Sequence, residues 1–378
     1  MKVLTSVLLA SVLAGSPSVS MANALDNAPA TPATPAVAAE PSPASLYFDG
    51  DYQPVAPAAA VYEQRAPLRH DAARQAWHWQ LHFAQPPGKL HMDAWLLGTD
   101  VASPRYAGQR SVYFADGQLG LQEERNGEGD FNGVNVEYYA DGTVKSRKAY
   151  RDGEYDGLHS HYHANGQLRH ALLYQAGQPA DGEFLSFDEH GQVSNRAHFA
   201  DGVLTGEVTA FHPDGRLAER GPYLDGQRNG LHQAWWPDGR EMSRLNFLHG
   251  KPQGWSLLYF ANGQLDQKNL FEDGVMLSTQ SWRDDGTPLR QRQQDEQGRA
   301  QGDDRQWHAN GTLARLASYR DGEPHGAWRE WHADGSPRHA VDYARGRKQG
   351  LERAWAGDGT RTVCEWQDGR LLRACRNF

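Results

Sequence analysis

The stretch YYADGTVKSRKAYRDGEYDG, residues 138–157, contains the pattern that decides the fold. An aromatic residue, Tyr138, stands four residues before the turn glycine Gly142, and a second one, Tyr150, stands eight residues after it. The same arrangement returns every 23 to 25 residues from residue 113 to the C-terminus. Repeats of this length form one supersecondary unit each, and neighbouring units stack in a row.

The first aromatic column predicts a structural ladder with one ring per unit. The residue before the turn glycine is Asp or Asn in ten of the eleven units, and Pro213 and Pro237 precede it in two of them. Pro fits the second place of a type I turn, Asp or Asn the third, and Gly the fourth with positive φ. This predicts a three-residue hairpin loop closed by a G1 bulge. The ladder consists of Tyr113, Tyr138, Tyr162, Phe187, Phe211, Trp235, Tyr259, Trp282, Trp307, Trp331 and Trp355.

This turn predicts the strand register and the fold class. Tyr138 should pair with Val144, because an aromatic residue opposite an aliphatic one stabilises a hairpin. Strict alternation then places Val144 and Tyr150 on one face, and Lys145 and Arg147 on the other. Repeated glycines and the lack of a 3.6-residue apolar stripe disfavour helices. The predicted fold is all-β, an elongated array of antiparallel β-hairpins forming a twisted single-layer sheet.

The stretches at residues 138–157 and 162–177 (YHANGQLRHALLYQAG) resemble the MORN-repeat variant, as in YwqK-type proteins labelled antitoxins. The resemblance covers residues 113 to about 369. It implies antiparallel hairpin repeats, protein–protein contacts and, in some members, pairing with a toxin. The chain departs from the pattern at Arg125, which stands where the second aromatic residue belongs, and at QDEQG, residues 294–298.

The N-terminal third is organised differently. Residues 1–24 read as a signal peptide, with Lys2, an apolar run and ANA ending at Ala24, which predicts export to the periplasm or beyond. Ser16 stands where a lipoprotein would need Cys, and a retained anchor is the alternative. Residues 25–60 are rich in Ala and Pro and predict a disordered spacer, in which LYFDGDY at 46–52 could form a strand. Residues 61–112 predict a β-structured N-terminal cap, with WHWQLHF at 77–83 as a half-buried strand.

Residues 113–378 are assigned to eleven repeats and a C-terminal capping hairpin. Cys364 and Cys375 are the two cysteines of the chain and flank this last hairpin. In an oxidising compartment such a pair predicts a disulfide bond, and two free buried cysteines are the alternative.

Little in the sequence indicates enzymatic chemistry. It contains no nucleophile elbow, P-loop or dinucleotide fingerprint, and the carboxylates lie in predicted turns, so we expect no enzyme and no cofactor. The net charge of −9 and the lack of a basic tract disfavour nucleic acid and anionic membranes. His159, His161 and His163 are weak metal-ligand candidates. Because His212 and His308 share the column of His163, a variable solvent-facing column is the alternative.

Surface binding is the remaining function. Tyr139, Trp236 and Phe260 are predicted to lie on the charged face and form the candidate binding surface, because aromatic side chains are enriched at contact hot spots. We therefore expect an exported scaffold that binds another protein at the cell envelope, without an integral span after signal cleavage. An immunity protein against a secreted toxin and a glycan-binding or glycan-acting protein are the alternatives. Association of sheet edges into homo-oligomers stays open.

Overall fold

The computed structural model describes residues 46–85, 87–357 and 359–378. They fall into two compact units: the first runs to Ala180 and includes Glu189–Gly191, and the second contains Asp181–Asp188 and Gln192–Phe378. The regular structure of these residues consists of 32 β-strands and one short 3-10 helix, η1 (Pro57–Ala59). The predicted signal peptide and residues 25–45 of the predicted spacer lie outside them. In the described part of the chain, no helix has the length and apolar character needed to cross a membrane.

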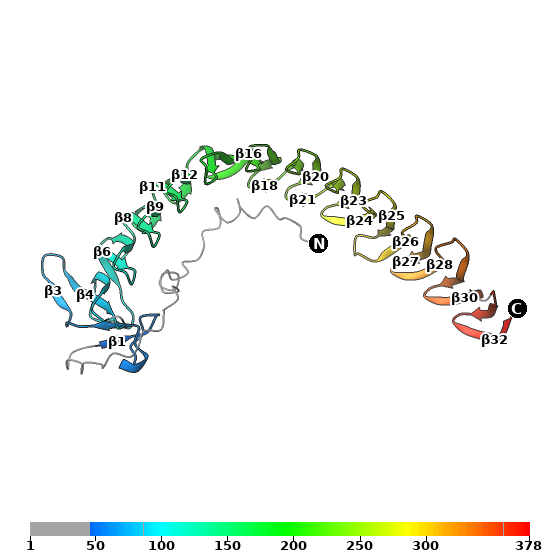
Figure 1. Cartoon of the computed structure of the whole chain (residues 1–378), viewed down its shortest axis with the longest axis horizontal. Helices are drawn as coiled ribbons and strands as arrows, with labels where there is room; N and C mark the ends of the chain where they lie inside the picture. Colours follow the sequence, from blue (N-terminus) through cyan, green and yellow to red (C-terminus); the bar gives the residue numbers. More distant parts are fainter. Residues whose placement is uncertain (1–45, 86, 358) are drawn as a thin grey trace. The chain divides into compact units, whose positions relative to one another are not determined.

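Strands that lie side by side in the sheet pair antiparallel within each unit, so the predicted all-β hairpin array is confirmed (Figure 1). The first unit contains β1 (Leu46–Phe48), β2 (Tyr62–Gln64), β3 (Arg69–Asp71), β4 (Ala76–Phe83), β5 (Leu90–Leu96), β6 (Tyr106–Tyr113), β7 (Leu119–Arg125), β8 (Gly133–Tyr138), β9 (Val144–Arg151), β10 (Glu154–Tyr155), β11 (Gly157–Tyr162), β12 (Leu168–Gln175) and β13 (Gln178–Pro179). The second unit contains β14 (Gly182–Phe187), β15 (Val193–Ala200), β16 (Val203–Phe211), β17 (Leu217–Leu224), β18 (Gln227–Arg228), β19 (Gly230–Trp235), β20 (Glu241–Leu248), β21 (Lys251–Pro252), β22 (Gly254–Tyr259), β23 (Leu265–Glu272), β24 (Val275–Trp282), β25 (Pro288–Gln294), β26 (Ala300–Trp307), β27 (Leu313–Arg320), β28 (Glu323–Trp331), β29 (Pro337–Ala344), β30 (Arg347–Trp355), β31 (Arg361–Gln367) and β32 (Arg370–Asn377).

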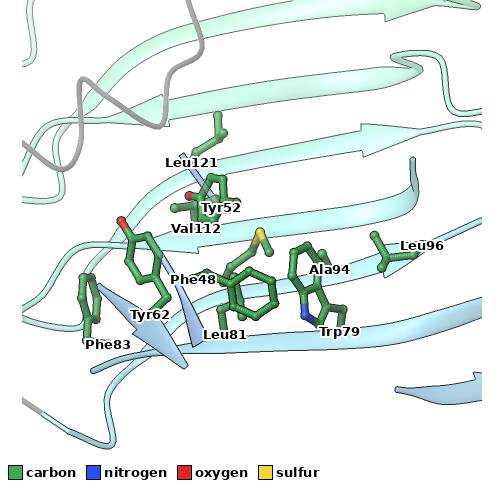
Figure 2. Close-up of a cluster of buried hydrophobic side chains, with 11 residues drawn as sticks. Phe48, Tyr52, Tyr62, Trp79, Leu81, Phe83, Ala94, Leu96, Val112 and Leu121 are labelled. Carbon is green, nitrogen blue, oxygen red and sulfur yellow. The ribbon is translucent and has the colours of Figure 1, made fainter. Parts of the chain in front are cut away.

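The main hydrophobic core lies at the N-terminal end of the first unit. Figure 2 shows the side chains of Phe48, Tyr62, Trp79 and Leu81 gathered there, and each is at most 1% exposed. The alternation in β4 supplies two of these residues, because Trp79 and Leu81 lie two residues apart and share a face. Residues 61–112, which the sequence assigns to a cap, contain β2 to β5 and most of β6.

The predicted spacer extends too far along the chain. Residues 46–60 are ordered: β1 pairs with β2, and Phe48 is fully buried while Tyr52 is 8% exposed. The LYFDGDY stretch therefore does contain a strand, and the assignment of residues 46–60 to a disordered spacer is wrong. The physical reason is that these two rings complete the apolar core, so their burial offsets the entropy lost when the segment is ordered.

Each repeat hairpin has the turn that its residues predict. The amide of Gly142 donates to the carbonyl of Tyr139 at 2.9 Å, and the amide of Tyr139 donates to the carbonyl of Thr143 at 2.8 Å. Gly142 has a φ of 84°, in the region that favours glycine. Tyr138 pairs with Val144, as predicted, and Phe211–Leu217 and Trp307–Leu313 are the same pair in later hairpins.

A second bulge, present in ten of the eleven repeat hairpins and missing only between β30 and β31, reverses the predicted face assignment. Tyr138 pairs with Val144, but the preceding residue Glu137 pairs with Ser146, so Lys145 is one extra residue in β9. Farther along, Gly133 pairs with Tyr150. Gly133 and Tyr138 are five residues apart in an uninterrupted strand, so they lie on opposite faces of the sheet. Their partners, Tyr150 and Val144, must therefore also lie on opposite faces. The prediction that Val144 and Tyr150 share a face is wrong, because the extra residue shifts the alternation by one.

We call the face that carries Tyr138 and its equivalents the ring face, and the face that carries Tyr150 and its equivalents the core face. Arg147 lies on the ring face with Tyr138, since it pairs with Val136, two residues away from Tyr138. All eleven rings of the predicted ladder are half-buried.

The core face holds neighbouring repeats together through a chain of aromatic contacts. In the first unit the ring of His159 lies 5.9 Å from that of Tyr150 and 4.6 Å from that of Tyr174. In the second unit Phe184 and Phe199 are at most 3% exposed, with ring centres 6.3 Å apart. Each such contact joins residues of adjacent strands, so a hairpin that would be marginal alone is stabilised by its neighbours.

The last two strands are joined covalently. Cys364 in β31 and Cys375 in β32 form a disulfide bond across 11 residues of sequence, which confirms the predicted pair. Closing a loop of this length stabilises a fold by about 2–3 kcal/mol. The bond therefore opposes fraying of the terminal strand β32.

Candidate functional site

The ring face of the first unit is hollowed between two neighbouring hairpins. The hollow is open, has a volume of about 620 Å³, and is lined by residues of β8, β9 and β11 together with the turn residues that follow β8 and β11. Its apolar lining includes Val134, Val144, Leu158 and Tyr162. Val134 is 50% exposed and Leu158 is 55% exposed. Both stand eight residues before a turn glycine, so the repeat itself places one apolar side chain per hairpin at this edge of the hollow.

One charged residue, Arg147, lines this hollow. Its guanidinium is exposed and makes no ion pair with any residue that the structure describes. The pairing of β7, β8, β9 and β11 places Gln122, Val136, Arg147 and Ser160 in one row across the ring face, and the other three are uncharged. An unpaired guanidinium above an apolar surface can bind a carboxylate in bidentate fashion while the apolar residues accept a side chain.

The residues predicted as the binding surface lie at the edge of the sheet, in the turns. Tyr139, Trp236 and Phe260 each stand three residues before a turn glycine, and all three are half-buried. The hydroxyl of Tyr139 donates a hydrogen bond of 2.9 Å to the carbonyl of Tyr162 in the next hairpin. This contact ties two repeats together and gives Tyr139 a structural role.

The same tether recurs along the array. His212 Nε2 donates to the carbonyl of Trp235, and His308 Nε2 donates to the carbonyl of Trp331, each at 2.9 Å. The guanidinium of Arg283 donates to the carbonyl of Trp307 at 2.8 Å. The variety of this column in the sequence suggests a solvent-facing position. The members that make this contact share the ability to donate a hydrogen bond, whereas Phe260 in the same column has no side-chain donor. That shared property is the signal by which the tether could have been found.

The three histidine candidates do not converge. His159 is 5% exposed on the core face, and its Nε2 atom lies 2.8 Å from the carbonyl oxygen of Ala149, so it must carry the proton. His161 stacks on His170, with ring centres 4.6 Å apart, while His163 belongs to the turn. The described residues contain no group of three or more side chains that could hold a metal ion. The expectation that these histidines lie on a polar solvent face is wrong for His159, because the extra residue Arg169 in β12 places Tyr174 on the same face as His159.

The His161–His170 pair makes the stability of the first unit sensitive to acid. Burial, together with the neighbouring charge, lowers the pKa of His161 to about 3 and that of His170 to about 4, below the ordinary value of 6.5. Protons therefore bind the unfolded chain more readily than the folded one. The stabilisation from neutral histidines is complete above pH 6.5 and is lost as the pH falls toward 4.

We expect the free energy of unfolding of the first unit to fall between pH 6.5 and pH 4. Replacing both rings with phenylalanine, as His161→Phe and His170→Phe, keeps the stacked pair and removes the titration. Urea unfolding of the full-length chain, followed by hydrogen exchange in β11 and β12 at several pH values, measures the effect. A variant with the same pH dependence as the parent protein would show that other groups cause it.

The similarities of this chain to known proteins are weak, apart from one family model. No curated protein has a sequence that matches this chain. Among solved structures, "Crystal Structure of TcdB2-TccC3-TEV" is 12% identical with a TM-score of 0.15 over 86% of this chain and 21% of that one. The "Structure of Photorhabdus luminescens Tc holotoxin pore, Mutation TccC3-D651A" is 13% identical with a TM-score of 0.15 over 88% of this chain and 20% of that one. The chain thus spans about a fifth of the length of these chains, and likenesses at such TM-scores support no argument.

A family model is more specific. The model described as "MORN repeat variant" matches residues 155–176, which contain all of β11 and β12. The match confirms the resemblance read from the sequence and leaves the YwqK-type subtype untested. It includes Leu158, Ser160 and Tyr162 of the hollow. The hairpin at residues 155–176 is thus similar to the MORN repeat variant.

Proposed function

We propose that the protein is a non-enzymatic scaffold that binds another protein through the hollow on the ring face of its first unit. The observation that carries this proposal is the exposure of Leu158 and Val134 beside the unpaired Arg147. Apolar side chains of this size are half exposed at the rim of a concave surface, where a partner's side chain could bury them. The MORN repeat variant match supports a binding role for the repeat.

The disulfide bond supports a location outside the cytosol. Disulfides persist in oxidising compartments such as the periplasm, and Cys364–Cys375 joins the only two cysteines of the chain. We therefore place the scaffold at the cell envelope. Arg147 favours a partner segment with an acidic residue next to an apolar one.

The test is partner capture by the mature protein and by single variants of the hollow. Leu158→Asp should weaken the captured partner's binding about tenfold or more, because it puts a charge where an apolar side chain is buried on binding. Leu248→Asp is the matched control, since Leu248 is 47% exposed and lies in the second unit. Equal retention of the partner by Leu158→Asp and Leu248→Asp would exclude the hollow as the site.

A further inference from the structure

A row of residues that contains seven basic side chains crosses the ring face of the second unit. The strand register pairs sixteen residues in succession, one from each of the long strands between β14 and β31. We call these residues the central row. It contains no carboxylate, although the chain as a whole has a net charge of −9. Its cations are Arg196, Arg220, Arg244, Lys268, Arg305, Arg329 and Arg353.

Three of these cations have no carboxylate partner among the described residues. Arg220 bonds the amide oxygen of Gln233 at 3.0 Å, and the ammonium of Lys268 lies 4.3 Å from the ring centre of Trp255. Arg353, in β30, is the third. Their positive charges are therefore not neutralised by ion pairs within the unit.

The other four cations each pair with a carboxylate in a neighbouring row. The pairs are Arg196–Glu183 and Arg244–Glu241 at 3.0 Å, Arg305–Asp303 at 2.5 Å and Arg329–Asp342 at 2.6 Å. The four guanidinium side chains are 32–55% exposed. Exposed ion pairs contribute about 0–1 kcal/mol each, so a ligand carboxylate can exchange with them at little cost.

Aromatic rings run parallel to the central row on the same face. The rings of Trp235 and Tyr259 are half-buried, and the guanidinium of Arg220 lies 5.5 Å from the ring centre of Trp235. On the other side of the row, Trp255 is 48% exposed. The sequence shows no basic tract, because the cations are about 24 residues apart along the chain. The fold brings cations and rings together in one stripe.

The spacing of the stripe indicates the kind of ligand. From Arg196 to Lys268 a cation appears in every second strand, and two strand spacings are about 9.6 Å. This is close to the length of one disaccharide in an extended β-linked polysaccharide. The sugar rings of such a polymer present apolar C–H faces that can pack on aromatic side chains. A nucleic acid carries one charge per nucleotide, which is a denser pattern than this row offers.

We propose that the central row and its flanking rings bind an acidic polysaccharide with one carboxylate per disaccharide. Each cation of the row takes one carboxylate, and the half-exposed rings take the faces of the intervening sugars. The Cys364–Cys375 bond indicates an oxidising compartment, where such polymers surround cells. This surface belongs to the second unit and is independent of the hollow in the first.

The experiment uses the mature protein and hyaluronan oligosaccharides of increasing length, which carry one carboxylate per disaccharide. Affinity should rise with length as more cations are engaged, and should fall as salt is added. The double variant Arg220→Glu, Lys268→Glu should bind about tenfold more weakly or worse. The control Arg338→Glu changes an exposed bulge residue of β29 that lies outside the central row, and should bind like the parent protein.

Neutral chitin oligosaccharides, single-stranded thymidine oligomers and poly-glutamate are the comparison ligands. Binding of hyaluronan in preference to all three, lost in the double variant and kept in Arg338→Glu, supports the proposal. Failure of hyaluronan to bind would overturn it, as would equal weakening by Arg338→Glu. Tighter binding of thymidine oligomers or of poly-glutamate would reassign the stripe to a nucleic acid or an acidic peptide.

Discussion

The substitution Gly221→Ala is expected to lower the free energy of unfolding of the second unit by about 2–4 kcal/mol. A Cβ atom on Gly221 would lie 2.1 Å from Nδ1 and 2.3 Å from Cγ of His232. The backbone of Gly221 does not have positive φ, so the loss would come from this overlap and not from backbone strain. The ring of His232, which is 3% exposed, would have to leave its site.

The displaced ring would lose three favourable contacts. Its Nε2 atom lies 2.9 Å from the carbonyl oxygen of Pro222, and its ring packs 5.4 Å from that of Tyr223 and 5.1 Å from that of Phe247. These contacts join three strands that are adjacent in the sheet, β17, β19 and β20. Hydrogen exchange of these strands in the full-length chain, with and without urea, measures the loss.

A double-mutant cycle separates the overlap from other effects of the methyl group. In a His232→Ala background the ring is gone, and Gly221→Ala should then cost less than about 0.5 kcal/mol. A loss of the same size in both backgrounds would mean that His232 does not occupy the space over Gly221, and the proposed contact would be wrong.

The local geometry of the repeat could be predicted from its residues because it depends on neighbours in the chain. Asp141 and Gly142 determine the turn, and the turn determines that Tyr138 faces Val144. The Cys364–Cys375 bond follows from composition and from the position of both residues beside the last hairpin. These predictions needed no knowledge of how one hairpin meets the next.

The face assignment failed because it depends on a bulge without a residue signature. Lys145 occupies the extra position in β9, and Leu289 occupies the equivalent one in β25. A bulge accommodates most residue types and accompanies increased local twist, so no residue type marks it. Without it, alternation predicts that Arg147 is remote from Tyr138, whereas the two share the ring face. The basic stripe of the second unit was missed for the same reason.

The candidate site was missed in part because the sequence of one repeat does not show which hydrogen bonds that repeat makes with the next. Tyr139 was expected to contact a partner, yet its hydroxyl bonds the carbonyl of Tyr162, 23 residues away. The hollow likewise forms between two hairpins, where Val134 and Leu158 occupy equivalent positions in successive repeats. Aligning the repeats identifies equivalent residues such as these. Only the pairing register of the strands shows which residues of neighbouring hairpins lie side by side.

The substitution Trp79→Ala is expected to cost the first unit about 3–5 kcal/mol, the largest single loss in the chain. Trp79 is 1% exposed, and its ring meets that of Phe48 edge-on with ring centres 5.7 Å apart (Figure 2). Its indole N–H donates a hydrogen bond of 2.9 Å to the side-chain oxygen of Gln64, which is itself 3% exposed. The variant therefore leaves a cavity and also an unsatisfied buried oxygen.

The effect should spread to the segment before β2. Phe48 packs on Trp79, and this contact offsets the conformational entropy that β1 loses on folding. Because the variant removes the contact, the amides of residues 46–48 should exchange much faster. Trp95→Ala is the matched control: Trp95 stacks on His78 at 4.7 Å and is half-buried outside the core cluster, so about 1 kcal/mol should be lost. If β1 kept its protection in Trp79→Ala, the segment would be held by its backbone pairing with β2, and the burial of Phe48 would not explain why residues 46–60 are ordered.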